Sequence, residues 1–150
     1  MYTKQEILDI AKNQLALDFS CKVEDLDKNE NTIVENILKD GRRLYGSDGC
    51  ALKILCFGNR AVVSTTPELI PWFQEKLKNF DANWLCLYTV LKSIDKKLME
   101  TGHEIVDVHH YYLPKGDIEE VEPITEIRWY EQSEILKFKD DERFDEAFAF

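Results

Sequence analysis

Asp107 and His109 are the two residues whose types and spacing best suit chemistry in this sequence. They lie in a stretch, residues 104–113, that is rich in β-branched and aromatic residues and therefore predicts a strand. Because alternate side chains of a strand share a face, Asp107 would lie beside His109, and Tyr111 would follow on the same face. A carboxylate in that place can orient an imidazole as a general base. The competing interpretation is a solvated or interface face with an ordinary hydrogen bond, where Asp107, His109 and Tyr111 contact a ligand or a partner.

The histidines and cysteines do not form a metal-binding pattern. His109 and His110 are adjacent, so a strand would point them to opposite faces, and His103 lies further back. The cysteines form no C-x-x-C pair, and we interpret them as reduced thiols that lie mostly in or near the core: Cys21, Cys50, Cys56 and Cys86. Cys50 could be a nucleophile, although a small residue that opens a strand explains it better. No metal ligand is assigned.

The remaining candidate patterns have structural explanations. The sequence contains no P-loop, and no G-x-G-x-x-G follows a strand. Glu119 and Glu120 lie in an acidic connector. Acid–base catalysis by two carboxyl groups needs one pKa raised above the other, and nothing in this connector would cause that difference. Six aromatic residues could line an organic ligand pocket, but such residues are more often core: Trp72, Trp84, Trp129, Tyr111, Tyr112 and Tyr130.

Composition and charge narrow the class of protein. The chain has 150 residues, of which 44% are hydrophobic and 32% charged, which predicts one core that needs no disulfide or metal. Lys and Arg number 19 against 29 Asp and Glu, so the net charge is −10. That charge repels phosphate backbones and anionic lipid, so we expect neither nucleic acid nor a membrane as a partner. The start has no secretory leader and no apolar run could span a bilayer, which predicts a cytoplasmic location.

The first half of the chain predicts a helix followed by strands. Thr3 and Glu6 have the spacing of a capping box, and apolar residues then recur at helical spacing to Leu17. After a polar turn, Gly-containing dipeptides separate short β-branched runs over residues 32–65. We expect three or four antiparallel strands there, with the firmest pairing between residues 51–57 and 60–64.

Helix signals return in the second half. Thr66 and Pro67 suit the N-cap and the first position of a helix that runs to about Lys78. A third helix is expected over residues 90–100, and Gly102 would end it. Together with the strands, this order predicts an α+β fold in which helices pack on a mixed, largely antiparallel sheet.

The end of the chain predicts a boundary. A strand over residues 124–130 and a short helix over residues 132–138 follow the acidic connector. We therefore divide the chain into a lobe, residues 1–123, and residues 124–150, which would start or link to a second lobe. The apolar end, residues 147–150, is typical of a chain cut within a longer protein, and the alternative is a tail that docks on its own domain.

Seven stretches of sequence carry a further signal. They are NTIVEN at 31–36, GRRLY at 41–45, SDGC at 47–50, LKILCFG at 52–58, IDKKL at 94–98, GHEI at 102–105 and DVHH at 107–110. Together they resemble the N-terminal region of larger bacterial GNAT-family N-acetyltransferases, and the likeness spans nearly the whole chain.

This resemblance implies a degenerate GNAT-like lobe that precedes a catalytic lobe. Family members bind acetyl-CoA through Arg/Gln-x-x-Gly-x-Gly/Ala, and the nearest string here is residues 43–48. Asp48 would occupy the last small position, where its carboxylate would crowd and repel the diphosphate. Leu98 stands where the family often has a general-acid tyrosine. The resemblance therefore transfers no catalytic or cofactor-binding residue, and it implies acetyl-CoA only for the full-length relative.

Two functions from different classes follow. The first is the non-catalytic N-terminal lobe of an acetyl-CoA-dependent N-acetyltransferase, which would support the catalytic lobe in cis and close one wall of the acceptor pocket. A negative wall would suit an amine acceptor. The alternative is a free-standing interaction or small-ligand-binding module without acetyltransferase activity. A third hypothesis is an enzyme that uses Asp107 and His109. The sequence also leaves open whether the chain forms a homodimer.

Overall fold

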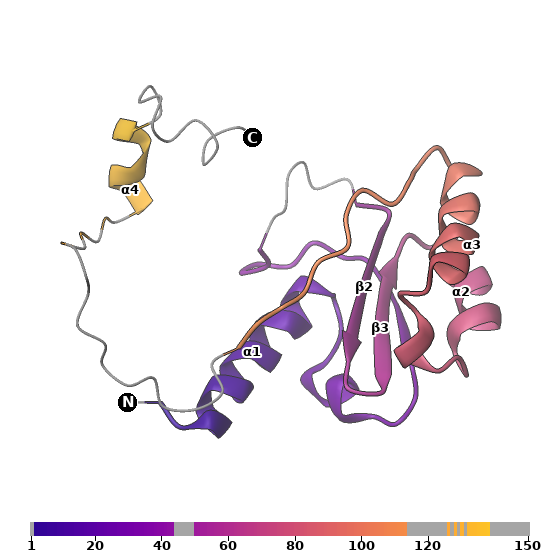
Figure 1. Cartoon of the computed structure of the whole chain (residues 1–150), viewed down its shortest axis with the longest axis horizontal. Coiled ribbons are helices and arrows are strands. Elements are labelled where there is room, and N and C mark those ends of the chain that lie inside the picture. Colours follow the sequence, from indigo (N-terminus) through magenta and orange to yellow (C-terminus); the bar gives the residue numbers. More distant parts are fainter. Residues whose placement is uncertain are drawn as a thin grey trace. The chain divides into compact units, whose positions relative to one another are not determined.

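The computed structural model describes residues 2–43, 50–113, 126, 128, 130 and 132–138. The chain divides into two units, Met1–Asp117 and Ile118–Phe150. The first unit contains, in order, α1 (Lys4–Asp18), the 3-10 helix η1 (Val23–Asp27), β1 (Thr32–Glu35), β2 (Leu52–Phe57), β3 (Arg60–Thr65), α2 (Ile70–Leu77), the 3-10 helix η2 (Ala82–Trp84) and α3 (Tyr88–Met99) (Figure 1). This arrangement of three helices and a three-stranded mixed sheet confirms the α+β class.

The sheet has the order β1-β3-β2. β2 pairs with β3 as the expected antiparallel hairpin, and Gly58 turns between them with φ of 63°. The antiparallel order expected over residues 32–65 was wrong for β1, which runs parallel to β3, and the sheet is therefore mixed, as expected. β3 takes the centre because nearly all of it is buried, including Val62 and Val63, whereas the outer strands are mostly half-buried.

The terminal signals in the sequence predicted α1 and α3 correctly, but not the start of α2. α1 begins at the expected capping box, where the Thr3 hydroxyl accepts from the Glu6 amide and the Glu6 carboxylate accepts from the Thr3 amide. α3 matches its prediction, and Gly102 follows it with φ of 78°. The expected start of α2 at Thr66 was wrong. A turn precedes that helix, closed by the Leu69 amide on the Thr66 carbonyl, and the proline in its first turn is Pro71.

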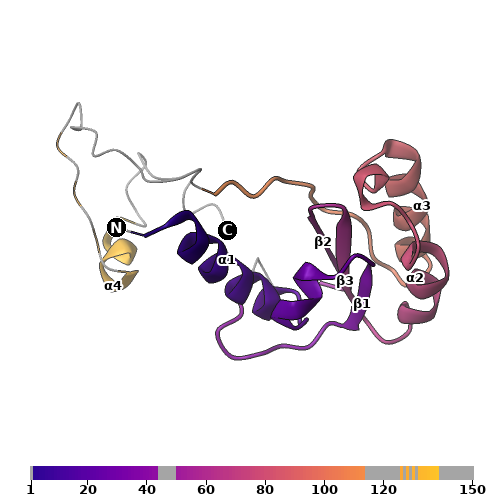
Figure 2. The same cartoon turned by 90° about the horizontal axis from the view of Figure 1, so that it is seen from below.

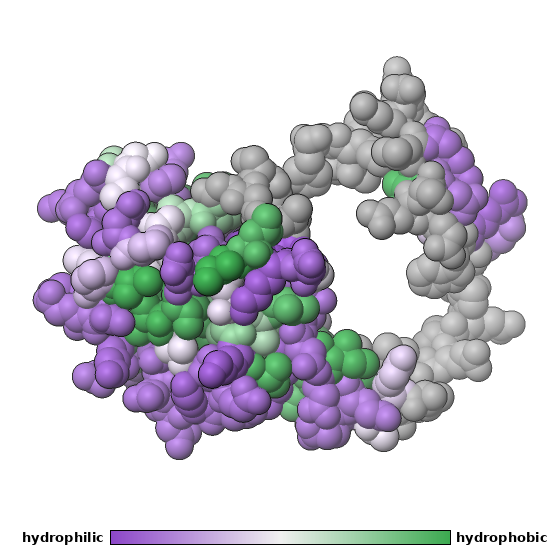
Figure 3. Space-filling view, turned by 180° about the vertical axis from the view of Figure 1, so that it is seen from behind, coloured by the Kyte–Doolittle hydropathy of each residue, from purple (hydrophilic) through white to green (hydrophobic). Residues whose placement is uncertain are grey.

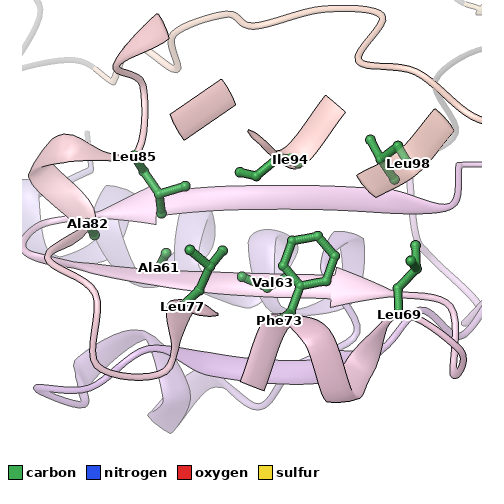
Figure 4. Packing of buried hydrophobic residues seen from close by; sticks show 9 residues of the cluster. All are labelled: Ala61, Val63, Leu69, Phe73, Leu77, Ala82, Leu85, Ile94 and Leu98. Carbon is green, nitrogen blue, oxygen red and sulfur yellow. The ribbon is translucent and has the colours of Figure 1, made fainter. Parts of the chain in front are cut away.

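The two faces of the sheet support two separate apolar clusters (Figure 2). One face packs against α2 and α3, and its buried residues are Ala61, Val63, Leu69, Phe73, Leu77, Ala82, Leu85, Ile94 and Leu98 (Figure 4). The other face packs against α1 and η1 and buries Leu15, Ala16, Phe19, Cys21, Leu26, Leu55 and Val62. Helices on both faces of a sheet this small leave its central strand inaccessible to solvent.

Residues 103–113, which we call the extended segment, do not form the predicted strand. The Ile105 amide donates to the Asp95 carboxylate at 2.8 Å, and the Ile105 side chain packs on the cluster beneath α3. Beyond it, every residue from 106 to 113 is exposed. β-branched and aromatic residues favour a pleated, half-buried surface, but a strand also needs a neighbour to hydrogen-bond with. None of the described strands pairs with this segment.

Only a few residues of the second unit are described. Its helical turn, α4 (Gln132–Ile135), continues into the 3-10 turn η3 (Leu136–Phe138), which confirms the expected short helix. The rings of Tyr130 and Phe138 meet edge to face at 4.9 Å, and Lys137 lies over the Tyr130 ring. Most of the strand expected at 124–130, and all of the apolar end at 147–150, lie outside the described residues. Among the described residues, no helix has the length and apolar content to cross a membrane.

Candidate functional site

The side chains of Asp107, His109 and Tyr111 lie in a row on one face of the extended segment. The His109 Nδ1 atom is 3.0 Å from the Asp107 Oδ2 atom, which is the pairing expected from their spacing. The rings of His109 and Tyr111 follow at 5.3 Å between centroids, tilted by 54°. An extended backbone produces this row by itself, because its side chains repeat every two residues. The carboxylate can therefore orient the imidazole without any help from the sheet.

The opposite face of the segment has a different character. His110 and Tyr112 stack loosely there, with ring centroids 6.2 Å apart. Val106 is 91% exposed and Tyr112 is 88% exposed. The segment thus presents one face with the Asp107 and His109 pair and an opposite face that is apolar except for His110, and both are open to solvent.

Solvent exposure limits what the Asp107 and His109 pair can do by itself. The His109 side chain is 53% exposed and that of Asp107 is 70% exposed. A general base works best where a pocket excludes water and holds the substrate. Two open depressions in the described part of the chain have other linings: one is polar and includes Asn31, Lys78 and Asp81, and the other lies around Gly58 and Arg60. The pair therefore has the geometry of an oriented imidazole, but it lines neither of these depressions.

The stretch compared with an acetyl-CoA motif is described only at Arg43, since residues 44–49 are outside the described ranges. The Arg43 side chain is engaged by Asp18, through Nε at 2.7 Å and a terminal nitrogen at 2.6 Å, and the Arg43 amide donates to Asp18 at 2.8 Å. Burial by itself would raise the pKa of Asp18, but hydrogen bonds from Arg43 and Gln14 lower it below its ordinary value. Because the Asp18 carboxylate stays charged beside Arg43, it would repel a pyrophosphate at this position. We therefore derive no chemical step through acetyl-CoA in this chain.

Leu98, which the resemblance noted above sets at the position of a general-acid tyrosine, has a structural role. It is 2% exposed and belongs to the cluster that joins α3 to the sheet. The Leu98 carbonyl also accepts from the amides of Thr101 and His103, which closes the end of α3. A side chain buried in this way packs the fold and has no acidic proton.

The aromatic candidates among the described residues line neither of the two depressions. Trp72 packs edge to face on Phe73 with ring centroids 5.0 Å apart, whereas Trp84 is 56% exposed. Trp129 lies outside the described residues. Across the described ranges, no group of three or more His, Cys, Asp or Glu residues is placed to hold a metal ion.

Two polar features were missed by the sequence analysis. Asn31 is buried between α2 and β3, and Cys56 contacts Cys86 across a gap of 30 residues in the chain. We expected most of the cysteines to lie in or near the core, whereas both residues of this pair are exposed. The sequence indicates only that Cys56 lies close to the turn at Gly58. No local pattern indicates that Cys86 is its neighbour.

Comparison with known proteins does not assign the chain to a family: no protein-family model, no curated protein and no solved structure matches it significantly.

Proposed function

We propose that this chain is the N-terminal, non-catalytic lobe of a GNAT-family, acetyl-CoA-dependent N-acetyltransferase, and that its first unit is a degenerate GNAT-like lobe. In this proposal the chain packs against a catalytic lobe in cis and closes one wall of the acceptor pocket. The observation that carries the proposal is the extended segment, which has the composition of a strand but pairs with none of the described strands.

A partner lobe would supply the neighbouring strand that the backbone of this segment needs for hydrogen bonding. The backbone of an extended chain can add to an exposed sheet edge, and its alternating side chains then enter pockets on either side. The Val106 and Tyr112 face is apolar enough to be buried in such an interface. Apolar side chains also gather in a band across the first unit, bordered by polar ones (Figure 3). A large exposed apolar surface is characteristic of interaction sites.

The other face of the segment suits the acceptor. If the apolar face is buried, Asp107, His109 and Tyr111 line the opposite side, and a neighbouring lobe would supply the enclosure that they lack. The net charge of −10 favours a protonated amine as the acceptor. Arg43 and Leu98 support a non-catalytic role, because each is committed to the packing of this unit.

Hydrogen–deuterium exchange on the extended segment tests the interface. In the 150-residue chain, we expect the amides of residues 106–113 to exchange nearly as fast as in an unfolded peptide. In the product of the complete reading frame, strand pairing should slow them by about 100-fold. The amides of β3 serve as an internal control, because they should be protected in both. Equal exchange of the segment in both products, or a reading frame that ends at Phe150, would support the free-standing module instead.

A pair of matched variants separates docking from folding. Val106→Lys should remove most of the added protection in the longer product, because the lysine would be forced into the apolar interface. Tyr2→Lys, at another exposed residue, should leave that protection unchanged. Both variants should keep the unfolding midpoint of the 150-residue chain, since neither side chain is buried there.

A further inference from the structure

Two thiols from distant parts of the first unit meet at one end of the sheet. Cys56 lies near the end of β2, and Cys86 lies between η2 and α3. Cys56 pairs in register with Ala61, and Ala61 lies at the same end of the cluster as Ala82 and Leu85, the latter next to Cys86 in sequence (Figure 4). The Cys56 Sγ atom is 4.0 Å from the carbonyl oxygen of Ala82, which lies four residues before Cys86, and the Cys86 thiol is close enough to raise the pKa of Cys56.

We propose that Cys56 and Cys86 form a site of reversible oxidative modification, at which a low-molecular-weight disulfide converts the two thiols into an intramolecular disulfide. Both residues are exposed, so an oxidant can reach them. Cys21 is buried in the cluster under α1, and the same oxidant cannot reach it without unfolding. Cys50 is half-buried, so Cys56 and Cys86 are the two exposed cysteines among the four.

The surroundings of the two sulfur atoms set the order of the steps. Although part of Cys56 is exposed, burial of its sulfur raises the pKa to about 11, and the adjacent Cys86 contributes to the rise. Because the thiolate is the attacking species, Cys56 is a poor nucleophile at neutral pH. We therefore assign the first attack to Cys86 and the second to Cys56.

Atoms and electrons balance in two exchange steps. Cys86 loses its proton to solvent and attacks one sulfur of the oxidant, so that a mixed disulfide forms and one thiolate leaves. Cys56 then loses its proton and attacks the Cys86 sulfur, and the second half of the oxidant leaves as a thiolate. The two thiolates take up the two protons, so the oxidant is reduced by two electrons to two thiols. The disulfide closes a loop from β2 through α2 to the start of α3.

Treatment of the 150-residue chain with oxidised glutathione tests this site. We expect the number of free thiols to fall from four to two and the mass to fall by about 2 Da, because two hydrogens leave. Peptide mapping should join the Cys56 and Cys86 peptides, and dithiothreitol should restore four thiols. Stable glutathione adducts on both cysteines, or a disulfide between two chains, would overturn the proposal.

Serine variants test the order of attack. Cys56→Ser should accumulate a glutathione adduct on Cys86, whereas Cys86→Ser should react at Cys56 about tenfold more slowly. Cys50→Ser is the control and should form the internal disulfide as the native chain does. Circular dichroism establishes that each variant is folded. Equal adduct rates in the first two variants would contradict the assigned order, and failure of Cys50→Ser to form the disulfide would contradict the pair itself.

Discussion

Phe73→Ala should lower the free energy of unfolding of this chain by about 4 kcal/mol, the range found for large aromatic residues removed from cores. Phe73 has no exposed surface, and its ring lies between Val63 of β3 and Leu69 at the start of α2 (Figure 4). It also supports Trp72, which packs edge to face on its ring. The truncation removes apolar burial and leaves a cavity that the surrounding strand and helix cannot fill.

Urea denaturation followed by circular dichroism measures this effect. The midpoint should fall while the dependence on urea stays the same, because the surface exposed on unfolding changes little. Tyr88→Ala, on α3 and 75% exposed, is the matched control and should shift the unfolding free energy by less than about 0.5 kcal/mol. Similar losses in the two variants would show that the cluster around Phe73 does not hold α2 and α3 on the sheet.

Asn31→Asp should destabilise the chain by about 4 kcal/mol at neutral pH. The Asn31 Nδ2 group donates to the carbonyls of Leu77 and Phe80 at 2.6 and 2.7 Å, and its Oδ1 atom accepts from the Ala61 amide at 2.7 Å. This side chain is buried and joins the end of α2 to the central strand. An aspartate keeps the acceptor, loses both donors and places a negative charge against two carbonyl oxygens.

The effect of Asn31→Asp should depend on pH. The two carbonyl oxygens favour the protonated acid, so the pKa of the new carboxyl should be higher in the folded chain than in the unfolded one. The destabilisation should therefore be smallest below the unfolded pKa, about 3.9, and should grow as pH rises through the folded pKa. Asn79→Asp, at an exposed site in the loop after α2, should show almost no such change. A pH-independent loss for Asn31→Asp would contradict the charge argument.

Local signals in the sequence predicted local structure well. The capping box at Thr3, the turn at Gly58 and the glycine after α3 each depend on neighbours in the chain, and all are present in the structure. The parallel pairing of β1 was not predictable from its own residues, because it depends on which strand lies beside it. β1 pairs with β3 and not with β2, the next strand in the chain, and that choice is a property of the whole unit.

The candidate site was predicted in its geometry but not in its surroundings. The spacing of Asp107 and His109 placed them on one face, and an extended backbone is sufficient for that. The sheet that we expected around them is absent from the described part of the unit, because pairing depends on a free edge elsewhere and not on β-propensity alone. The contacts of Asn31 and of Cys56 with Cys86 join residues at least 30 positions apart, beyond the reach of any local pattern.

Calorimetric titration with acetyl-CoA tests the proposed non-catalytic lobe most directly. The 150-residue chain should give no heat of binding, because Arg43 is engaged by Asp18 and nothing else described here forms a pyrophosphate cradle. The product of the complete reading frame should bind with micromolar affinity through its catalytic lobe. Micromolar binding by the 150-residue chain would contradict the proposal and place a cofactor site within these residues. Absence of binding in both products would equally contradict it and favour an interaction module.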